Sequence, residues 1–436
     1  MLLIHVPKLT NRLGYTLKVV FNYLLHAEYS ITTDAQYYLQ YGDAKLSYGR
    51  ERLDDGLFIK CHPLLFETTI EEQDPKAECR EGQWFLFPAY GRNTDFPFDP
   101  LAAIFYMVSR YEEYLPHHED AHGRFMACDS LAFQKGFLDQ PVVDQWARMI
   151  KMKILERYPD YEMPRQNYLF EQTIDVDAAW CYLHKGIYRT TVGLFRDFFA
   201  RRDYEESARR LRVLTHKEAD PFDTFDYLLA TSQRAPGSHL FFFTLLSDYG
   251  PYDKPASYLN RHMRELVQHL DDYAKMGIHP SYNTLEHPQL VDKEIKRLED
   301  IIHRPIIRSR FHFLRFRLPM SYRVIKRAGI SDDFSMGYAD AVGFRAGISV
   351  PYPFYDLERD HEIELIIHPF SIMDTTLQNY LKLKPEEGLE QYKRLIDNVR
   401  AVDGTFCCVV HNQNLSEFYG WAGWRDVYEK MVDYAR

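Results

Sequence analysis

Several features that would assign a protein class at once are scarce or absent in this sequence of 436 residues. Its six cysteines show no CxxC spacing and are too sparse for a secreted disulfide scaffold, which fits reduced thiols in a cytoplasm. No stretch reaches the about 18 uninterrupted apolar residues that a membrane-spanning helix needs. The apolar N-terminus is interrupted by His5, Pro7 and Lys8 before a signal peptide can form. We therefore expect a cytoplasmic protein without a membrane span.

Basic residues are not in excess either. The formal net charge of −10 argues against a nucleic-acid partner, because phosphate contacts require concentrated Lys and Arg. Apolar residues make up 46% and charged residues 27%, so the whole chain should fold without a long disordered segment. Aromatic residues are abundant at 15% and serve as core filling or as flat platforms for sugar rings.

The length predicts two domains. The short polar segment 160–167, which contains a proline, is the expected boundary, so we predict domains at 1–165 and 166–436. In the first, alternating short apolar runs indicate small α/β structure. Pro100 is expected to open one helix, and the residues from Val142 to Tyr158 form an amphipathic second. No site chemistry stands out in this half.

The second half alternates apolar strands with helical stretches. Strands are expected over 168–177, 239–246, 308–314, 364–370 and 405–411, with helices over 258–276 and 288–302. This alternation predicts parallel strands covered by helices, either as a barrel or as an open doubly wound sheet. In both architectures the chemistry lies at the carboxyl ends of the strands.

The first polar cluster is a pair of acids at the end of a strand. Asp175 and Asp177 are two residues apart, so both side chains can point into one pocket. One carboxylate can bind a cation while the other takes a proton from an attacking water. A strand-ending turn with two solvated acids would give the same pattern.

Two further clusters follow later strands. His279 and Asn283 are four residues apart, which in a helical turn places both ligand atoms on one side for a metal such as zinc. Arg310 and His312 share one face of the next expected strand. A guanidinium there would keep Asp175 ionised and oriented, and His312 could contact substrate.

The remaining candidates lie in loops and at late strand ends. Asp333 and Arg345 belong to two glycine-bounded loops, 332–337 and 343–347, of the kind that holds substrate on a rigid scaffold. His411 ends a buried strand, and a histidine near neutrality can protonate a leaving amine. His368 ends another strand equally well, and spacing alone does not separate the two.

These clusters, in this order, resemble the polysaccharide deacetylase family, also called carbohydrate esterase family 4 or the NodB homology domain. The resemblance covers about residues 168–436 and implies a distorted (β/α) barrel. It implies Asp175 as catalytic base and Asp177 and His279 as ligands of a divalent metal, most of all zinc. It also implies His411 as general acid and Arg310 as the residue that braces the base.

The sequence departs from the family pattern at one ligand. The family has histidine where this chain has Asn283, so Asn283 or the nearby His287 would complete the site, or activity would be lost. Arg345 is a second contender for the bracing arginine. The segments 96–115, 122–125 and 137–146 further resemble a long Bacteroidetes subgroup with an uncharacterised N-terminal domain.

The resemblance implies a metal-dependent hydrolase that removes an acetyl group from a sugar or glycan precursor. Two rival readings stay open at this point. The chain could be a catalytically silent carbohydrate-binding protein, which Asn283 favours, or an amidohydrolase acting on a small non-sugar amide. Neither the sugar nor the oligomeric state follows from the sequence.

Overall fold

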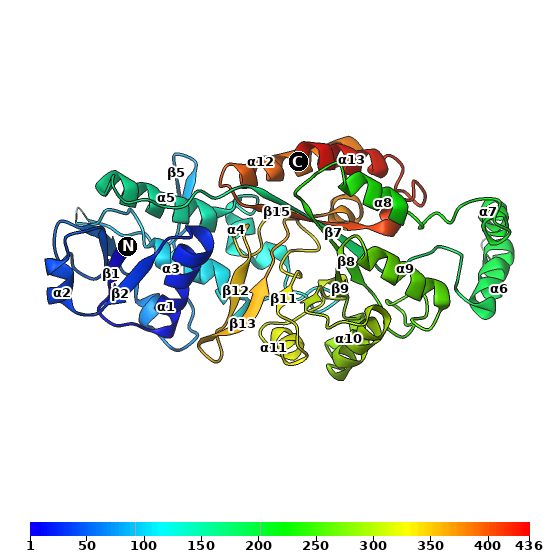
Figure 1. The fold of residues 1–436 in the computed structure, drawn as a ribbon, viewed down its shortest axis with the longest axis horizontal. Helices are drawn as coiled ribbons and strands as arrows, with labels where there is room; N and C mark the ends of the chain where they lie inside the picture. The colour runs from blue at the N-terminus through cyan, green and yellow to red at the C-terminus, as the bar shows by residue number, and fades with distance from the viewer. Residues whose placement is uncertain (92, 201) are drawn as a thin grey trace.

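The computed structural model describes residues 1–436 except 92 and 201. Two sheets organise the chain, a small one near the N-terminus and a large one after residue 168 (Figure 1). Among the described residues, no helix combines the length and the apolar character that crossing a membrane requires.

The N-terminal sheet is parallel and has the strand order β2-β1-β3-β4. Its strands are β1 (Leu2–His5), β2 (Tyr29–Thr32), β3 (Lys45–Gly49) and β4 (Leu57–Lys60). The helices of this half are α1 (Asn11–Lys18), continued by a π-helical stretch (Val19–Leu24), α2 (Ala35–Gln40), α3 (Pro100–Val108), α4 (Leu131–Lys135) and α5 (Val142–Arg157). A hairpin of β5 (Glu78–Arg80) and β6 (Gln83–Phe85) completes it. Pro100 opens α3 as predicted, after Asp99 caps its first N–H groups.

The large sheet has nine strands in the order β12-β13-β11-β10-β9-β8-β7-β15-β14. All neighbours pair in parallel except β12 and β13. The strands are β7 (Leu169–Val176), β8 (His239–Thr244), β9 (Lys275–Ile278), β10 (Arg308–Ser309), β11 (Asp332–Asp333), β12 (Tyr352–Asp356), β13 (His361–Ile367), β14 (Ile372–Met373) and β15 (Thr405–His411). The predicted alternation and parallel sheet are confirmed, but in the described residues no ladder joins β14 to β12 or β13, so a closed barrel is not confirmed.

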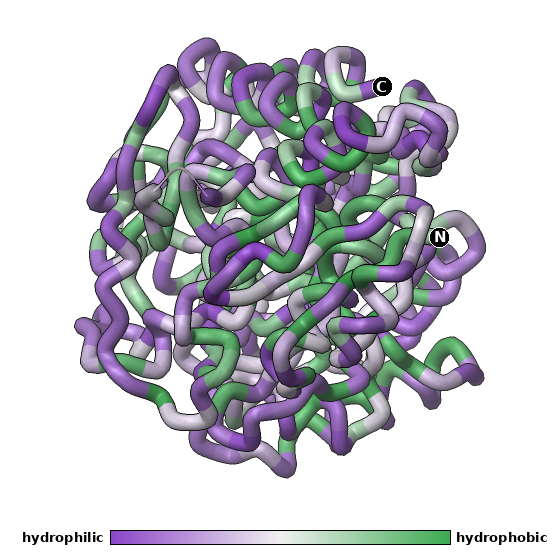
Figure 2. Tube along the Cα trace, turned by 90° about the vertical axis from the view of Figure 1, so that its left-hand side faces the viewer, coloured by the Kyte–Doolittle hydropathy of each residue, from purple (hydrophilic) through white to green (hydrophobic). Residues whose placement is uncertain are grey.

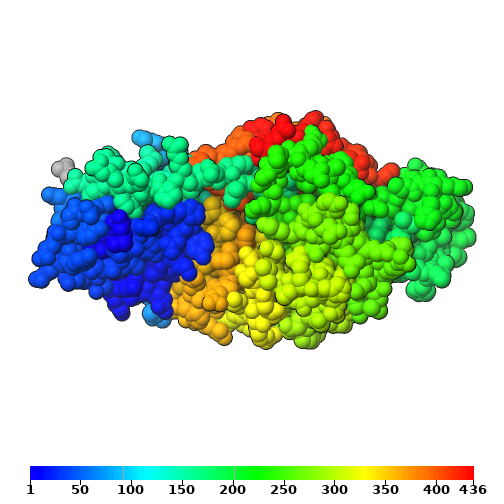
Figure 3. Space-filling model, viewed as in Figure 1, coloured from blue at the N-terminus to red at the C-terminus, as the bar shows by residue number. Residues whose placement is uncertain are grey.

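Helices cover this sheet on the outside (Figure 1). They are α8 (Phe225–Ser232), α9 (Arg261–Asp271), α10 (Gln289–Ile302), α11 (Met320–Arg327), α12 (Pro385–Arg400) and α13 (Trp424–Ala435). In a second view, hydrophobic segments run through the interior and hydrophilic ones over the periphery (Figure 2). A separate helical pair, α6 (Ile187–Phe195) with its π-helical end (Arg196–Ala200) and α7 (Tyr204–Leu214), extends from the body as an arm (Figures 1 and 3).

Two predicted element boundaries were wrong. The helix predicted over 258–276 ends at Asp271, because Lys275 and Met276 already pair with β8 as part of β9. The strand predicted over 308–314 stops at Ser309, and the chain then makes a 3-10 turn over His312–Leu314 with Phe313 at a φ of 60°. Apolar runs this short do not distinguish a long strand from a strand followed by a turn.

The N-terminal part packs directly on loop 334–350 of the C-terminal part. Buried Arg345 is paired with Glu113 at 2.7 Å, and Glu113 is also paired with Arg110. Gly343 lies against the backbone of Leu138, and the next residue, Phe344, donates its N–H to the Leu138 carbonyl. Apolar residues of both parts belong to one continuous core.

Replacing Gly343 with alanine should lower the free energy of unfolding by about 2 to 4 kcal/mol. The residue has a φ of +129°, and a Cβ atom there would collide with the Leu138 carbonyl group, which is backbone and has little room to move. Urea unfolding of the variant measures the loss. Gly42→Ala is the matched control, because Gly42 is exposed with nothing near its Cβ position. Equal stability of the two variants would contradict this packing.

Candidate metal centre and catalytic pocket

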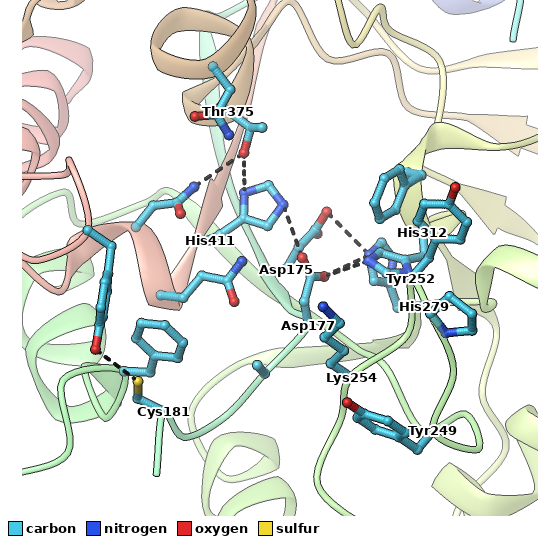
Figure 4. A pocket seen from close by; sticks show the side chains of 18 of the residues that line it. Asp175, Asp177, Cys181, Tyr249, Tyr252, Lys254, His279, His312, Thr375 and His411 are labelled. Atoms are coloured by element: carbon cyan, nitrogen blue, oxygen red, sulfur yellow. Dashed lines mark hydrogen bonds and ion pairs between the residues drawn. The ribbon is translucent and has the colours of Figure 1, made fainter. Parts of the chain in front are cut away.

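A cavity of about 1090 Å³ opens where the carboxyl ends of the central strands meet. Its floor holds Asp175 and Asp177 from the end of β7, His279 after β9, His312 after β10 and His411 at the end of β15 (Figure 4). Parallel strands place their carboxyl ends at one edge, which is why residues 236 positions apart in sequence become neighbours here.

Three of these side chains form a compact donor group. One ligand atom each from Asp177, His279 and His312 lies within 4.8 Å of the other two. The Nε2 atoms of His279 and His312 are 3.3 and 3.5 Å from Asp177 Oδ1. That oxygen is buried and accepts no hydrogen bond from any residue the structure describes. Two imidazoles and one carboxylate around an unsatisfied oxygen are a fitting set for a divalent cation such as zinc.

The Nδ1 atoms of His279 and His312 each have a hydrogen-bond partner on the side away from Asp177. The Nδ1–H of His279 donates to the backbone carbonyl of Arg310. His312 Nδ1 is 2.7 Å from Asp253 Oδ1, which also accepts the backbone N–H of Tyr282 at 3.0 Å. These bonds fix the ring orientations and leave each Nε2 facing Asp177, the arrangement that orients imidazole ligands in metal sites.

The charges of this group are strongly coupled. Burial alone would raise the pKa of Asp177, but His312 and His411 hold it well below its usual range. Burial likewise opposes protonation of His312, yet Asp177 and Asp253 raise its pKa to about 9. A proton on His312 therefore occupies the position where a cation would bind, and cation binding would release it.

Asp175 is oriented by a buried arginine. Arg310 donates from Nη1 to Asp175 Oδ1 at 2.8 Å and to the Thr173 hydroxyl at 2.7 Å, while its Nε donates to the Phe334 carbonyl. The guanidinium also lies 4.6 Å from the centre of the Phe243 ring. The second carboxylate oxygen of Asp175 is 3.8 Å from His279 Nε2. One oxygen is thus fixed by Arg310, and the other faces the donor group.

On the opposite side, His411 is paired with Asp374. The distance from Nδ1 to Asp374 Oδ1 is 2.7 Å, and Asp374 Oδ2 accepts the His411 backbone N–H and the Asn414 amide. His411 Nε2 lies 3.7 Å from Asp177 Oδ2. Burial would lower the pKa of His411, but Asp374 and Asp177 outweigh it and raise the pKa to about 10. The imidazole is therefore held as a cation that can give up a proton.

Some predicted site residues are not brought to the cavity. Asn283 is exposed in a 3-10 turn whose other two side chains, Tyr282 and Thr284, are buried, and His287 is exposed beyond it. The chain is extended at Ser281, so the helical-turn spacing assumed for His279 and Asn283 does not exist. His312 occupies the third position of the donor group instead.

The two residues predicted to bind substrate from glycine-bounded loops make buried contacts away from the cavity. Asp333 is fully buried and accepts hydrogen bonds from the Ser309 hydroxyl and from the N–H and hydroxyl groups of Ser335. Arg345 is paired with Glu113 of the N-terminal part and donates to the Gly337 carbonyl. Neither residue lines the cavity. Loop 343–347 packs on the N-terminal part, whereas Asp333 makes its hydrogen bonds within the C-terminal part.

His368, the competitor of His411, lies away from the cavity. Its Nε2 is 3.0 Å from Asp332 and its Nδ1 is 3.6 Å from Glu171, and its ring stacks on Phe334. Burial opposes its charge, but Asp332 and Glu171 raise its pKa to about 9. His368 therefore belongs to a buried ion cluster of the sheet.

The stabilisation by His368 should depend on pH. The folded-state pKa of about 9 is above the ordinary value of about 6.5, so the contribution is complete below pH about 6.5 and is lost as pH rises through about 9. The destabilisation caused by His368→Gln should thus be larger at pH 6 than at pH 9.5, by roughly 2 to 3 kcal/mol. Urea unfolding of both proteins at the two pH values measures the difference. A pH-independent cost would show that the pair with Glu171 and Asp332 contributes no linkage.

Sequence reasoning missed two residues that orient cavity histidines and one residue that lines the cavity. Asp374 directly follows β14, but this strand has only two residues and gives no periodic signal in the sequence. Asp253 lies in a loop with no such signal. Arg124 reaches the cavity from the N-terminal part and donates to the Phe313 carbonyl and the Tyr380 hydroxyl.

Comparisons with known proteins give a family for the N-terminal part. Residues 2–159 match the model of a family of unknown function, DUF7033. No curated protein matches the chain. The family match covers the first sheet and α1 to α5, and it assigns no activity.

Among solved structures, the chain is similar to two proteins described as polysaccharide deacetylases. One, from Mycobacterium smegmatis, has 13% identity and a TM-score of 0.38, with 62% of this chain and 85% of that chain covered. The other, from Bacillus cereus, has 10% identity and a TM-score of 0.29, with 62% and 87% covered. Likeness at this level carries no function, which has to be argued from the site.

Proposed function

We propose that this chain is a divalent-metal-dependent hydrolase that removes an acetyl group from an N-acetylated or O-acetylated sugar or glycan precursor. The observation that carries the proposal is the donor group of Asp177, His279 and His312 at the floor of a large cavity. Asp175 and His411 flank this group on two sides, as a base and an acid for hydrolysis would.

The donor group fits a catalytic rather than a purely structural metal. Three protein ligands leave positions for water and substrate, whereas structural zinc sites are closed by four. The unsatisfied Oδ1 of Asp177 and the two oriented Nε2 atoms are the ligands offered. When bound, a cation of this kind lowers the pKa of water and polarises the acetyl carbonyl.

Asp175 takes the role of general base. Arg310 holds Oδ1, so the other oxygen is available for a proton from the attacking water. The ion pair with Arg310 fixes the orientation of the carboxylate. Thr173 and Phe334 share the remaining donors of Arg310 and hold the guanidinium in place.

His411 takes the role of general acid. Asp374 holds Nδ1 and stabilises the imidazolium, so the proton on Nε2 faces the donor group. An amine leaving from the acetyl carbon needs a proton at this point, because a free amide anion is a poor leaving group. Asp175 and His411 take different roles because their partners differ. Asp175 is paired with an arginine, and His411 is paired with a carboxylate.

The shape and lining of the cavity favour a sugar. A volume of about 1090 Å³ is large for a single small amide. Six tyrosines line it and offer flat faces and hydroxyl groups, namely Tyr182, Tyr188, Tyr249, Tyr252, Tyr380 and Tyr419. Tyr252 stacks on Tyr282 at 4.0 Å, which gives the wall a rigid aromatic surface.

Acetate release from N-acetylated sugars and small N-acetyl amides by the zinc-reconstituted chain tests the proposal. Release from sugars supports it, and release only from small amides would assign an amidohydrolase instead. Sugar binding without acetate release, with metal bound, would assign a silent carbohydrate-binding protein.

A further inference from the structure

The wall of the cavity is basic although the chain as a whole has a net charge of −10. Six lysines and arginines line it against three carboxylates, Asp175, Asp177 and Glu206. The basic residues are Arg124, Lys185, Arg189, Arg196, Arg210 and Lys254. An acidic protein that concentrates cations in one cavity attracts an anionic ligand there.

Half of these cations are already neutralised. Arg124 is paired with Asp120 at 2.6 Å, and Arg210 with Asp197 at 2.5 Å. Arg196 also lies 3.5 Å from Asp197. Lys185, Arg189 and Lys254, by contrast, form no ion pair with any residue that the structure describes.

The three uncompensated cations come from the two segments that border the cavity on one side. Lys185 is half-buried, and burial lowers its pKa although Cys181 and Asp220 act in the opposite direction. Arg189 lies 4.2 Å from the centre of the Tyr249 ring and donates to the Pro255 carbonyl. Lys254 extends into the cavity beside Tyr249 (Figure 4). None of the three has a carboxylate at ion-pair distance among the described residues, so an anionic ligand would supply a close partner.

We propose that Lys185, Arg189 and Lys254 bind a phosphoryl group of the substrate, so that the acetylated sugar enters as a phosphate or diphosphate ester. This inference rests on the proposed function, which supplies the acetylated sugar. It adds that the sugar is attached to a phosphate or diphosphate group. A phosphoryl group with two negative charges matches three cations in one cavity better than a single carboxylate does. The donor group and the cations lie in the same cavity, so one ligand can reach both.

Binding of N-acetylglucosamine 1-phosphate and of N-acetylglucosamine to the full chain, measured by calorimetry in a chelator, tests the subsite without turnover. The chelator removes any metal that phosphate would ligate. The phosphate should bind at least about tenfold more tightly, since hydrogen bonds to charged groups add that much. Lys185→Met with Arg189→Gln should abolish the preference, and the exposed Lys254→Met should reduce it. Lys296→Met, on the distant α10, is the control.

Each outcome has a defined meaning. Equal affinity for the two sugars, or a preference that survives the cavity variants, overturns the subsite. Equal binding of an N-acetylated sugar carboxylate overturns the phosphoryl assignment. Tighter binding of a nucleotide diphosphate sugar or of a short isoprenyl diphosphate sugar supports the subsite and identifies the carrier. A preserved phosphate preference without acetate release would refute the proposed function alone.

A second feature is the arm of α6 and α7, whose large apolar side chains are exposed to solvent. Ile187 is 85% exposed, Tyr188 79%, Phe195 65% and Phe199 60%. The contact inside the arm is polar, because the buried pair of Asp197 and Arg210 lies where an apolar seam would be expected. Exposed aromatic clusters of this kind mark interaction surfaces.

The charge of the arm indicates which kind of partner binds its exposed apolar face. Residues 185–217 contain nine basic and four acidic residues, a formal excess of five positive charges. Arg196, Arg202 and Arg212 are exposed, although Arg196 lies near Asp197 and Arg212 is paired with Glu218. Two such arms would repel each other, whereas an anionic bilayer would neutralise the arginines and accept the apolar side chains. We infer that the arm docks on an anionic membrane surface next to the cavity, which Tyr188, Arg189 and Arg196 also line.

Cosedimentation of the full chain with vesicles of phosphatidylglycerol and phosphatidylcholine tests this inference. Binding is expected with phosphatidylglycerol, and Phe195→Ser with Phe199→Ser should weaken it about tenfold or more. Phe133→Ser, at an exposed position on α4, is the control and should bind like the unchanged protein. No vesicle binding, or binding that the arm variant retains, refutes the inference. A concentration-dependent dimer that the arm variant abolishes would assign the face to a second copy.

Discussion

Replacing Asp175 with asparagine should lower turnover by about 10²- to 10⁴-fold while the metal content stays unchanged. The substitution keeps the size of the side chain and removes the oxygen that takes a proton from water. It leaves Asp177, His279 and His312 in place as ligands. The initial rate of acetate release and elemental analysis of the same sample measure the two effects.

Two further measurements keep this result interpretable. Asp175 is paired with Arg310 inside the protein, so the unfolding midpoint of the variant has to be compared with that of the unchanged chain. Asp226→Asn, at a fully exposed carboxylate on α8, should have normal turnover. Full activity of Asp175→Asn with metal bound would remove Asp175 as the base.

His312→Ala should lose the metal, and Asn283→Ala should keep it. His312 is one of the three donor residues, whereas Asn283 points to solvent. The loss should exceed the about 10- to 100-fold drop in affinity that removal of an outer partner causes. Elemental analysis after dialysis against zinc at neutral pH measures both variants side by side.

The reverse pattern would restore the assignment made from spacing. If Asn283→Ala loses the metal and His312→Ala retains it, the donor group of the structure is not the metal site. Asp253→Asn gives an intermediate test, because Asp253 only orients His312. Its metal affinity should fall by about 10- to 100-fold without complete loss.

The sequence was sufficient to locate most of the cavity floor. Asp175, Asp177, His279 and His411 were predicted to meet because each ends an apolar strand, and the end of a strand is a local property of the chain. The third member of the donor group was not predictable in this way. Asn283 was chosen for a helical spacing from His279, but the intervening residues are extended. His312 meets the group because β10 is short and turns early.

The residues that orient the histidines of the site are harder to predict from the sequence. Asp253 acts from a loop, and its position depends on contacts with His312 and Tyr282 that are remote in sequence. Asp374 follows a strand of two residues, too short for any periodic signal. The predicted distorted (β/α) barrel is not confirmed, because β13 and β14 are adjacent in sequence yet share no hydrogen-bonded pairing among the described residues.

The ion pair of Arg345 and Glu113 joins the two parts of the chain inside a shared core. Glu113 lies within the segment matched by the family of unknown function, and Arg345 lies on the loop beside the open side of the large sheet. A truncated chain starting near residue 166 would lose this counter-charge and would expose the apolar residues that now form one core with the N-terminal part. We therefore expect residues 166–436 to need the N-terminal part for their stability, so that biochemical work should begin from the intact polypeptide.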